Sequence, residues 1–564
     1  MMLAYQTPNV YFEHIDPPRQ LRAMRMDIAG FVGIAAYGPL HRAVKIDSWN
    51  QFTAIFGAHI AQGYLAYAIE GFFANGGQTC YVVRAADPEF ARKADLELIA
   101  NDDSHKVRLT SNTEEELVVS VVTASDSRFT LSLRRSDGSQ EVWRNLSMRS
   151  DDSRYVATVL NDQLTGSRIL SVSGNSVEHW PPDLAQLRLG EKWYVSSGSG
   201  GLFALTPAHF TGVGAPPLVR WGLSLFDLVD EVNVVAIPDI MFKPYAVARQ
   251  YTIPRRCQDL ESMDPPQPPM SPELEFPPPF SDAQIEAMQQ DLLNHCHLLK
   301  DRMALLDPRI SDISPGDIAA WRRRFTSKYG ALYFPWLLAP DPLQLDGLLR
   351  PVPPSGHVAG VYARLSFVQR NGQQAAAPSA PYRPTAGSFL PPVHIPPANE
   401  PLYAAQDVRM QVSNGDHGIL NLGGVNVIRP YNGRGIRIAG ARTMSDDTEY
   451  RFVNVRRLLL LISEVLDEQL QWTLFEANNQ NLWLDLDRVV RSFLRQMWEH
   501  GMLDGGTADE AFSVLCDETT NTPYEIENGR LVCEIGLNLP WPAEFVVVRI
   551  GKTEGGVELI EEGN

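Results

Sequence analysis

The feature that most constrains this chain is the order of three apolar segments near its start. IAGFVGIAAYGP, residues 28–39, is apolar almost throughout, which is typical of a buried strand. GYLAYAIEGFFANGG, residues 63–77, has helical spacing instead, and its final glycines mark a helix stop. The face that this helix should bury comprises Leu65, Ala68, Ile69 and Phe72. TCYVVRAAD, residues 79–87, is predicted to be a second strand, so the chain opens with an α/β unit.

The same two patterns recur further along the chain. Strands are predicted at 228–239, 330–342, 436–442, 511–518, 530–539 and, as a central strand, 543–551. A long helix should start at a capping box of Ser281 and Gln284. Its apolar stripe comprises Ile285, Met288, Leu292, Cys296, Leu299 and Met303. A helix over 453–470 should bury Val455, Leu458, Leu459, Ile462 and Leu466. A helix over 482–501, stopped at Gly501, should bury Leu486, Val489, Val490, Phe493, Leu494 and Met497.

Between Lys93 and Gly212 the pattern changes to short β-rich runs, such as ELVVSVVT and RFTLSLRR, separated by glycine-containing turns. This is typical of a small β domain, and its place between two α/β stretches predicts an insertion. The fold class is therefore α/β (α+β), multidomain, with an inserted β-rich domain and extended terminal arms. The predicted division is an N-terminal arm at 1–25, core at 26–92, insertion at 93–212, middle part with Pro-rich loops at 213–420, C-terminal core domain at 421–551 and C-terminal arm at 552–564.

Composition limits the classes of function. A chain of 564 residues with 44% hydrophobic and 21% charged residues fits a folded multidomain protein. Its formal net charge of −18 argues against a general nucleic-acid binder. Five unpatterned cysteines favour a reducing compartment, and they are Cys80, Cys257, Cys296, Cys516 and Cys533. The first residues lack the features of a Sec-type signal peptide, and the densest apolar run, 458–462, is too short to span a bilayer.

The stretch YNGRGIRIAGARTMSD, residues 431–446, has two glycines five positions apart, as a phosphate-binding loop does. A P-loop would follow the second glycine with Lys and then Ser or Thr, whereas Gly440 is followed by Ala441 and Arg442. A dinucleotide-binding fingerprint is excluded as well, because it would need a glycine at position 438. The structural interpretation is a tight turn at Asn432-Gly433 that leads into a strand, with Gly440 needed for close packing.

Other candidate chemical groups also favour structural roles. His295 and His297 point about 200° apart on a helix, so one metal ion cannot take both. Cys516 and Cys533 could face each other across paired strands, and buried free thiols are the expected state. The carboxylates Asp517, Glu518 and Glu534 could serve acid–base chemistry, but solvated charges or ion-pair partners are favoured. GSGG, residues 198–201, lacks the strand–turn–helix context of a nucleophile elbow. No catalytic, metal or cofactor site is predicted.

The longest motifs carry a resemblance to a known family. Residues 420–483, from LNLGGVNVIRPYNGRG to TLFEANNQNLW, resemble the tail sheath family of contractile phages and phage-tail-like contractile injection systems. Residues 30–57, 64–84, 295–307, 329–337 and 517–551 resemble further segments of the same family. The likeness covers most of the chain, but the Pro/Ala-rich stretch 371–399 is longer than the family's usual segment.

This resemblance implies a structural protein, not an enzyme, whose α/β parts form a sheath core. Such a protomer polymerises helically around an inner tube and contracts to drive the tube through a target envelope. The implied partners are further copies of the chain, the inner tube protein, and baseplate and terminator or cap proteins, with no nucleic acid and no direct membrane insertion. Assembly is expected in the bacterial cytoplasm, as part of a phage tail or phage-tail-like particle. A sheath-like baseplate or end-capping component is the alternative, and a nucleotide-using enzyme is a remote one.

Two surfaces are predicted to serve assembly. Arg488, Arg491 and Arg495 recur at i, i+3 and i+7, so they share one helix face. This face is either simply solvated or, as the family's use of a C-terminal helix implies, in contact with an acidic tube surface. The arms are the second surface, and each should add a strand to a neighbouring subunit's sheet unless it is disordered. The residues concerned are Val10, Phe12, Ile15, Val557 and Leu559.

Overall fold

The structure is a computed structural model of the chain. It describes residues 21–558 apart from 23, 37, 88–93, 100–105, 112–116, 126–127, 135–139, 148–151, 163–165, 168–169, 174–191, 196–200, 216–219, 244–275, 345–346, 367–392, 545–550 and 554–555. Contacts divide the chain into two compact units. Unit 1 comprises residues 1–24, 368–394 and 461–564, and unit 2 comprises 25–367 and 395–460.

An eight-stranded sheet forms the centre of unit 2, in the order β18-β17-β13-β12-β11-β1-β3-β2. Its six inner strands are parallel: β1 (Ile28–Gly33), β3 (Thr79–Arg84), β11 (Val234–Ala236), β12 (Met303–Leu306), β13 (Gly330–Phe334) and β17 (Val425–Tyr431). The edge strands β2 (Val44–Ile46) and β18 (Gly435–Ile438) are antiparallel to their neighbours. Every residue of β1, β11, β12 and β13 is buried, which explains why these segments are continuous apolar runs in the sequence.

Helices α2 (Leu65–Ala74) and α7 (Ser355–Ser366) pack against each other at very short range. A Cβ on Gly356 would lie 2.4 Å from Ala68 Cα, and one on Gly360 would lie 2.4 Å from the carbonyl oxygen of Phe72. The two backbones can therefore touch only because both positions of α7 are glycine. The predicted buried face of α2 is confirmed.

Two buried aspartates hold the first turns of these helices. Asp239 follows β11 and accepts hydrogen bonds from the backbone N–H groups of Ile34, at 2.6 Å, and of Tyr64, the N-cap of α2. Asp307 follows β12 and accepts from both the N–H and the hydroxyl of Ser355, which opens α7, at 2.9 and 2.6 Å. Burial raises the pKa of each carboxyl to about 7. The carboxyl ends of two neighbouring parallel strands thus cap the two helices.

Several further elements complete unit 2. The helices are α1 (Trp49–Phe56), α4 (Pro207–Thr211), α5 (Asp282–Leu299), α6 (Pro315–Arg322) and α8 (Asn414–Leu422), and the 3₁₀ turns are η2 (Leu202–Ala204), η3 (Gly222–Leu228), η4 (Pro238–Met241) and η5 (Thr448–Tyr450). The capping box of Ser281 and Gln284 is confirmed at the start of α5. The predicted stripe of α5 is wrong at its end, because the helix stops at Leu299 with Lys300 left-handed, and Met303 opens β12.

The prediction of one strand over 330–342 is also wrong. β13 stays in the large sheet, whereas β14 (Leu337–Pro340) pairs with β15 (Leu349–Val352) and β16 (Asp407–Val408) in a separate three-stranded sheet. Pro335 lies between the two strands and has no N–H to donate, so the hydrogen-bonding ladder cannot run through it.

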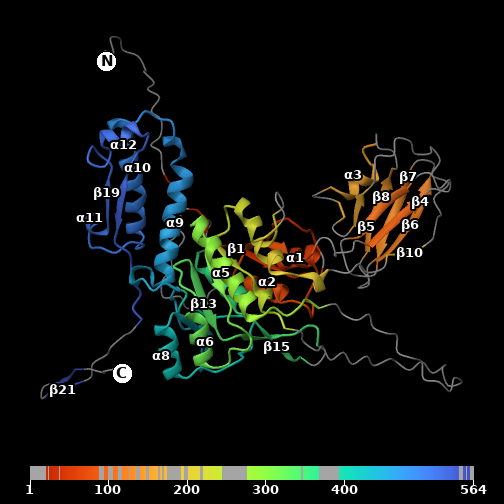
Figure 1. Cartoon of the computed structure of the whole chain (residues 1–564), viewed down its shortest axis with the longest axis horizontal. Coiled ribbons are helices and arrows are strands. Elements are labelled where there is room, and N and C mark those ends of the chain that lie inside the picture. The colour runs from red at the N-terminus through yellow and green to blue at the C-terminus, as the bar shows by residue number, and fades with distance from the viewer. Residues whose placement is uncertain are drawn as a thin grey trace, which may run out of the picture. The chain divides into compact units, whose positions relative to one another are not determined.

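The short β-rich runs between residues 94 and 195 form two small antiparallel sheets, shown in orange in Figure 1. One has the order β4-β5-β9, with β4 (Ala94–Ile99), β5 (Lys106–Ser111) and β9 (Leu170–Ser173). The other has the order β10-β6-β7-β8, with β6 (Leu117–Ser125), β7 (Arg128–Arg134), β8 (Gln140–Leu146) and β10 (Lys192–Val195), and α3 (Val156–Leu160) lies between β8 and β9 in sequence. The predicted β-rich character is confirmed, and the division of the chain into six parts stays a prediction.

Unit 1 contains a helix packed on a two-stranded sheet, in dark blue in Figure 1. α10 (Gln480–Glu499) buries all six residues predicted for it, and Gly501 just beyond it has φ of 71°. β19 (Phe512–Leu515) pairs antiparallel with β20 (Glu534–Leu537), and the short helices α11 (Ala508–Ala511) and α12 (Pro523–Glu527) precede and follow β19. β21 (Gly551–Thr553) and β22 (Gly556–Glu558) form a separate hairpin.

α9 (Val453–Gln469) begins in unit 2 and ends in unit 1, and η6 (Gln471–Thr473) follows it. Its predicted face is partly wrong, because Leu459 and Leu466 are half-buried whereas Leu460, Leu461 and Val465 are buried. The first six residues of α9 are all buried, so this part is enclosed on every side and has no simple amphipathic stripe. Within the described residues, no helix is both long and apolar enough to cross a membrane.

Candidate functional site

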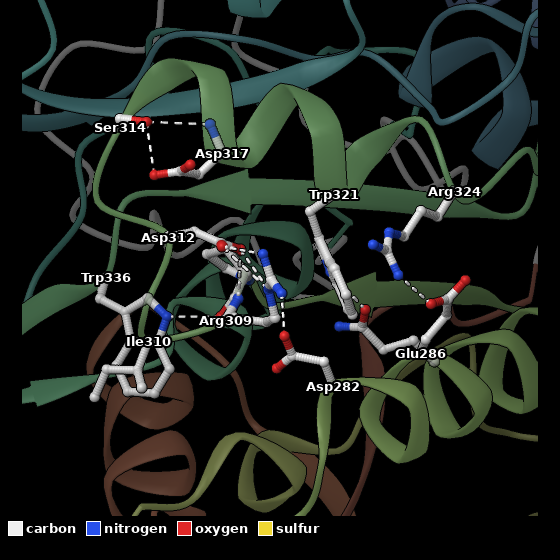
Figure 2. Close-up of polar contacts among 12 residues, drawn as sticks. Asp282, Glu286, Arg309, Ile310, Asp312, Ser314, Asp317, Trp321, Arg324 and Trp336 are labelled. Carbon is white, nitrogen blue, oxygen red and sulfur yellow. Dashed lines mark hydrogen bonds and ion pairs between the residues drawn. The ribbon is translucent and has the colours of Figure 1, made fainter.

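A polar network fixes the loop between β12 and α6, at the carboxyl end of the central strands. Trp321 is 1% exposed and lies between two guanidinium groups, those of Arg309 at 4.3 Å and Arg324 at 5.1 Å from its ring centre. Figure 2 shows that Arg309 is in turn bound by Asp312 of the same loop, at 2.6 Å, and by Asp282 of α5.

The neighbours of this loop hold it on every side. Trp321 donates to Gln289, which itself donates to the carbonyl of Asp307 at 2.7 Å, and Trp336 donates to the carbonyl of Pro308 at 2.8 Å. Every carboxylate drawn in Figure 2 is bound by an arginine or by a capping serine. The network therefore supports the shape of the loop.

The glycine-rich stretch 431–446 is a hairpin. Tyr431 of β17 pairs with Gly435 of β18, and Gly433 between them has φ of 71°. A Cβ on Gly440 would lie 2.9 Å from Oδ1 and 3.0 Å from Cα of Asn426. Both parts of the structural interpretation, the tight turn and the close packing, are confirmed.

The two histidines of α5 have separate environments. His295 is largely buried, its Nδ1 lies 3.4 Å from Asp227, and burial lowers its pKa to about 4. His297 is exposed and lies against the ring of Tyr329. Within the described residues, no group of three or more His, Cys, Asp or Glu side chains could hold a metal ion.

The C-terminal hairpin places the remaining candidate groups. By the β19–β20 register, Cys516 stands opposite Cys533, and both are free thiols whose pKa is raised, chiefly by burial. Asp517 is exposed and accepts hydrogen bonds from Thr519, which lower its pKa. Glu518 accepts a hydrogen bond from Gln480, and Glu534 is exposed on β20. These groups have the structural environments expected from the sequence.

The three arginines predicted to face a tube have different surroundings. Arg488 is exposed and forms an ion pair with Asp485 at 2.9 Å. Arg491 is half-buried, forms an ion pair with Asp487 at 2.8 Å and donates to the carbonyl of Val514 in β19. Arg495 is exposed, and within the described residues its side chain makes no hydrogen bond or ion pair. The guanidinium of Arg491 is thus bound by groups within unit 1. The contact of Arg488, Arg491 and Arg495 with a tube stays a prediction.

The arms are described only in part. Val10, Phe12, Ile15 and Leu559 lie outside the described residues, as does most of the strand predicted at 543–551. Val557 lies in β22 and pairs with Lys552 of β21. This part of the C-terminal arm therefore has a partner strand within its own chain. Strand addition to a neighbouring subunit stays a prediction.

One feature of the sheet in unit 1 fits such an addition. Within the described residues, β19 and β20 pair with each other and with no further strand, and the carbonyl of Val514 in β19 accepts from Arg491. Phe512 and Val514 are buried on one face, against α10, whereas Ser513 and Leu515 are exposed on the other. A two-stranded sheet is marginal by itself and gains stability from further strands.

The pair Arg456-Arg457 at the start of α9 was not singled out from the sequence. Arg457 is 1% exposed and donates to the carbonyl of Met26, at 2.8 Å, and to the hydroxyl of Ser366. It also lies over the ring of Tyr362, and burial lowers its pKa to about 10. The sequence signal for this buried arginine is the pair of consecutive arginines inside the apolar run VNVRRLLLLI, because a charged side chain within a buried segment must find partners there.

Comparisons with known proteins find one matching family model and several solved structures with a similar fold. Residues 445–552 match the family model of the phage tail sheath C-terminal domain. The chain is similar to a protein in the contracted PVC sheath complex of an extracellular contractile injection system, with 16% identity, 98% and 99% of the two chains covered, and a TM-score of 0.54. It is also similar to a protein in the contracted baseplate of the anti-feeding prophage, with 18% identity, 98% and 99% coverage, and a TM-score of 0.55.

The third similar structure is the crystal structure of a sheath tail protein from Desulfitobacterium hafniense, with 12% identity, 90% and 94% coverage, and a TM-score of 0.52. A search of curated proteins finds no match. The mixed α/β fold predicted from the sequence is confirmed: the chain shares the fold of these sheath proteins over nearly its whole length, and residues 445–552 match the phage tail sheath C-terminal domain.

Proposed function

We propose that this chain is the protomer of a contractile sheath. Copies would polymerise helically around an inner tube in an extended form, and the sheath would then shorten and drive the tube through a target envelope. The observation that carries the proposal is the likeness of 98% of the chain to a protein in a contracted sheath complex, together with the sheath-domain match at residues 445–552.

The proposed partners follow from this role. They are further copies of the chain, an inner tube protein, and baseplate and terminator or cap proteins. The particle would be a phage tail or a phage-tail-like device assembled in the bacterial cytoplasm. The work of contraction would come from rearranged subunit contacts, because a lower free energy of the contracted lattice and a barrier between the two states are sufficient. No nucleotide would be consumed by the sheath itself.

The β19–β20 sheet has only two strands among the described residues, and this supports the proposal that arms link the subunits. An arm that added one strand of four residues would make about four ladder hydrogen bonds, at roughly 1 kcal/mol net each. A few kcal/mol per contact, repeated along a helical lattice, is enough to tie neighbours together while larger surfaces slide. Head-to-tail contacts between copies related by a rotation and a translation do not close, and they would generate a helix.

Electron microscopy of the purified chain in negative stain tests the main proposal, which predicts long striated cylinders. Truncation after Gly551, or removal of residues up to Ile15, should give folded chains that do not polymerise. Normal contractile cylinders from either truncated chain would show that the arm concerned is not a required link. Removal of residues 93–212, joined by a short linker, should leave assembly intact, because the inserted β domain is proposed to lie on the outside of the cylinder.

A sheath-like baseplate or end-capping component is the second candidate, and the similarity to a protein in a baseplate structure favours keeping it. The two roles differ in the length of the assembly. A protomer of the sheath extends without limit, whereas a baseplate or cap component forms rings or short stacks. The distribution of particle lengths in the same micrographs therefore separates them.

A further inference from the structure

The turn between α9 and α10 exposes an aromatic side chain in a strained conformation. Phe475 is 106% exposed, and its φ is 65°. Within the described residues it is the one Phe, Tyr or Trp with positive φ, a region in which bulky side chains are disfavoured. Leu474 beside it is 59% exposed. Exposed apolar surface and backbone strain at the same residue indicate a contact that is made with a partner.

The turn is held from both sides, so its shape does not depend on that partner. Before it, the hydroxyl of Thr473 donates to the carbonyl of Leu470 at 2.9 Å. After it, Asn478 donates to the carbonyl of Arg530 at 2.8 Å and accepts from the indole of Trp483 at 2.7 Å. We call Leu474, Phe475 and Glu476 the tip. Glu476 is exposed and, within the described residues, makes no hydrogen bond or ion pair through its side chain.

Unit 2 carries a cavity whose lining includes two arginines, Arg442 and Arg451, and one carboxylate, Asp446. A cavity of about 340 Å³ is lined by Leu422, Gly423, Gly424, Arg442, Thr443, Ser445, Asp446 and Arg451. The side chain of Arg451 makes no hydrogen bond or ion pair within the described part of the chain. Leu422 lines this cavity and is 70% exposed, and Ile419, about one turn earlier on α8, is 65% exposed. We call Ile419, Leu422 and Arg451 the socket.

We propose that the tip of one copy of this chain docks in the socket of a second copy. Leu474 and Phe475 would cover the exposed side chains of Ile419 and Leu422, and Glu476 would pair with Arg451. The tip has two exposed apolar side chains and one free carboxylate, and the socket has two exposed apolar side chains and one free guanidinium, so the two can pair in chemistry and charge. The carboxylate of Asp446, which also lines the cavity, already accepts a hydrogen bond from Thr326. Such a tip–socket contact joins two different surfaces, so copies related by a rotation and a translation would propagate it into a helix, as a sheath requires. This inference rests on the proposed sheath function.

A charge exchange tests the pairing. The critical concentration for cylinder formation is measured by sedimentation and negative stain for the complete chain and its variants. E476R and R451E should each raise it about tenfold, and the double variant should bring it back to within about threefold of the parent value. F475S should raise it at least tenfold. All five side chains altered in these experiments and their controls are exposed or half-buried, and circular dichroism tests whether each variant is folded.

Two exposed positions serve as matched controls. L298S, at a leucine that is 77% exposed on α5, and E499R, at an exposed glutamate near the end of α10, should leave the critical concentration unchanged. If F475S assembles as readily as L298S, or if the double variant is as defective as the worse single one, the tip–socket contact is wrong. If the parent chain forms no cylinders under any condition, the sheath proposal itself fails, so the two failures are distinguishable.

Discussion

Arg491→Glu should loosen the sheet of unit 1, whereas the same change at Arg488 or Arg495 should not. The three arginines are equivalent in the helical repeat of α10, but the structure gives them different partners. Arg491 donates to the carbonyl of Val514 in β19 and to Asp487 one turn earlier on α10. A glutamate at 491 would remove both contacts and place a second carboxylate beside Asp487.

The magnitude follows from those contacts. A hydrogen bond from a charged donor to a part-buried carbonyl is worth about 1.5–3 kcal/mol. The i,i+4 ion pair is part-exposed, so its loss and the new repulsion add only a few tenths of a kcal/mol each. The sum is about 2–3 kcal/mol, which is roughly a 30- to 150-fold change in a local opening equilibrium at about 1.4 kcal/mol per tenfold. For Arg488, whose ion pair is exposed on both sides, we expect less than about 0.5 kcal/mol.

Hydrogen exchange of the complete chain, read in peptides that cover Phe512–Leu515, measures this opening directly. R491E should accelerate exchange there by the stated factor, and R488E and R495E should leave it unchanged. Equal acceleration by R488E, or none by R491E, would refute the structural role assigned to Arg491. These variants also sharpen the test for tube contact. The double variant R488E/R495E removes the basic surface without disturbing the sheet, so tube-templated assembly at low salt should be measured with that variant.

Two further predictions concern unit 2. Gly360→Ala should destabilise the chain by about 1–3 kcal/mol, because the new Cβ would lie 2.4 Å from the carbonyl oxygen of Phe72. Gly418→Ala on α8 has open space around it and should stabilise the chain by about 0.5–1 kcal/mol. Thermal unfolding measures both effects. His357 is fully buried beside Gly71, with Glu70 nearby, and burial lowers its pKa to about 4. As pH falls, His357 is protonated in the unfolded chain before it is protonated in the folded chain, so up to about 3 kcal/mol of the free energy of unfolding should be lost between pH 6.5 and 4. His357→Gln should flatten this pH dependence, which urea titrations at pH 7.5 and 5 measure.

The apolar periodicity determined the elements that bury a simple face. The six inward residues of α10 and the four of α2 follow directly from helical spacing, and the continuous runs at β1 and β12 follow from burial on both faces of a parallel sheet. The hairpin at 431–435 followed from its glycines, because a tight turn requires positive φ at a defined position. Long motifs also identified the sheath resemblance, since many residues had to agree at once.

Other features depended on which segments the fold brings together. Glycine is required at positions 356 and 360 only because α7 packs against α2, and no local sequence pattern predicts that contact. The aspartate that caps α2 lies 175 residues from Tyr64 in the sequence, and the aspartate that caps α7 lies 48 residues from Ser355. Hydrophobic periodicity predicts only which residues share a face of one helix or strand, whereas the hydrogen bonds of these aspartates join separate elements.

The arginine stripe shows the same division most directly. The sequence by itself determined that positions 488, 491 and 495 share a face of one helix, because 3.6 residues per turn fixes that geometry. Only the tertiary structure decided that Arg491 reaches the carbonyl of Val514 while Arg495 remains free within the described residues. The physical reason is that helical spacing is set by the local backbone, whereas the partner of a side chain is set by the strand packed beside the helix.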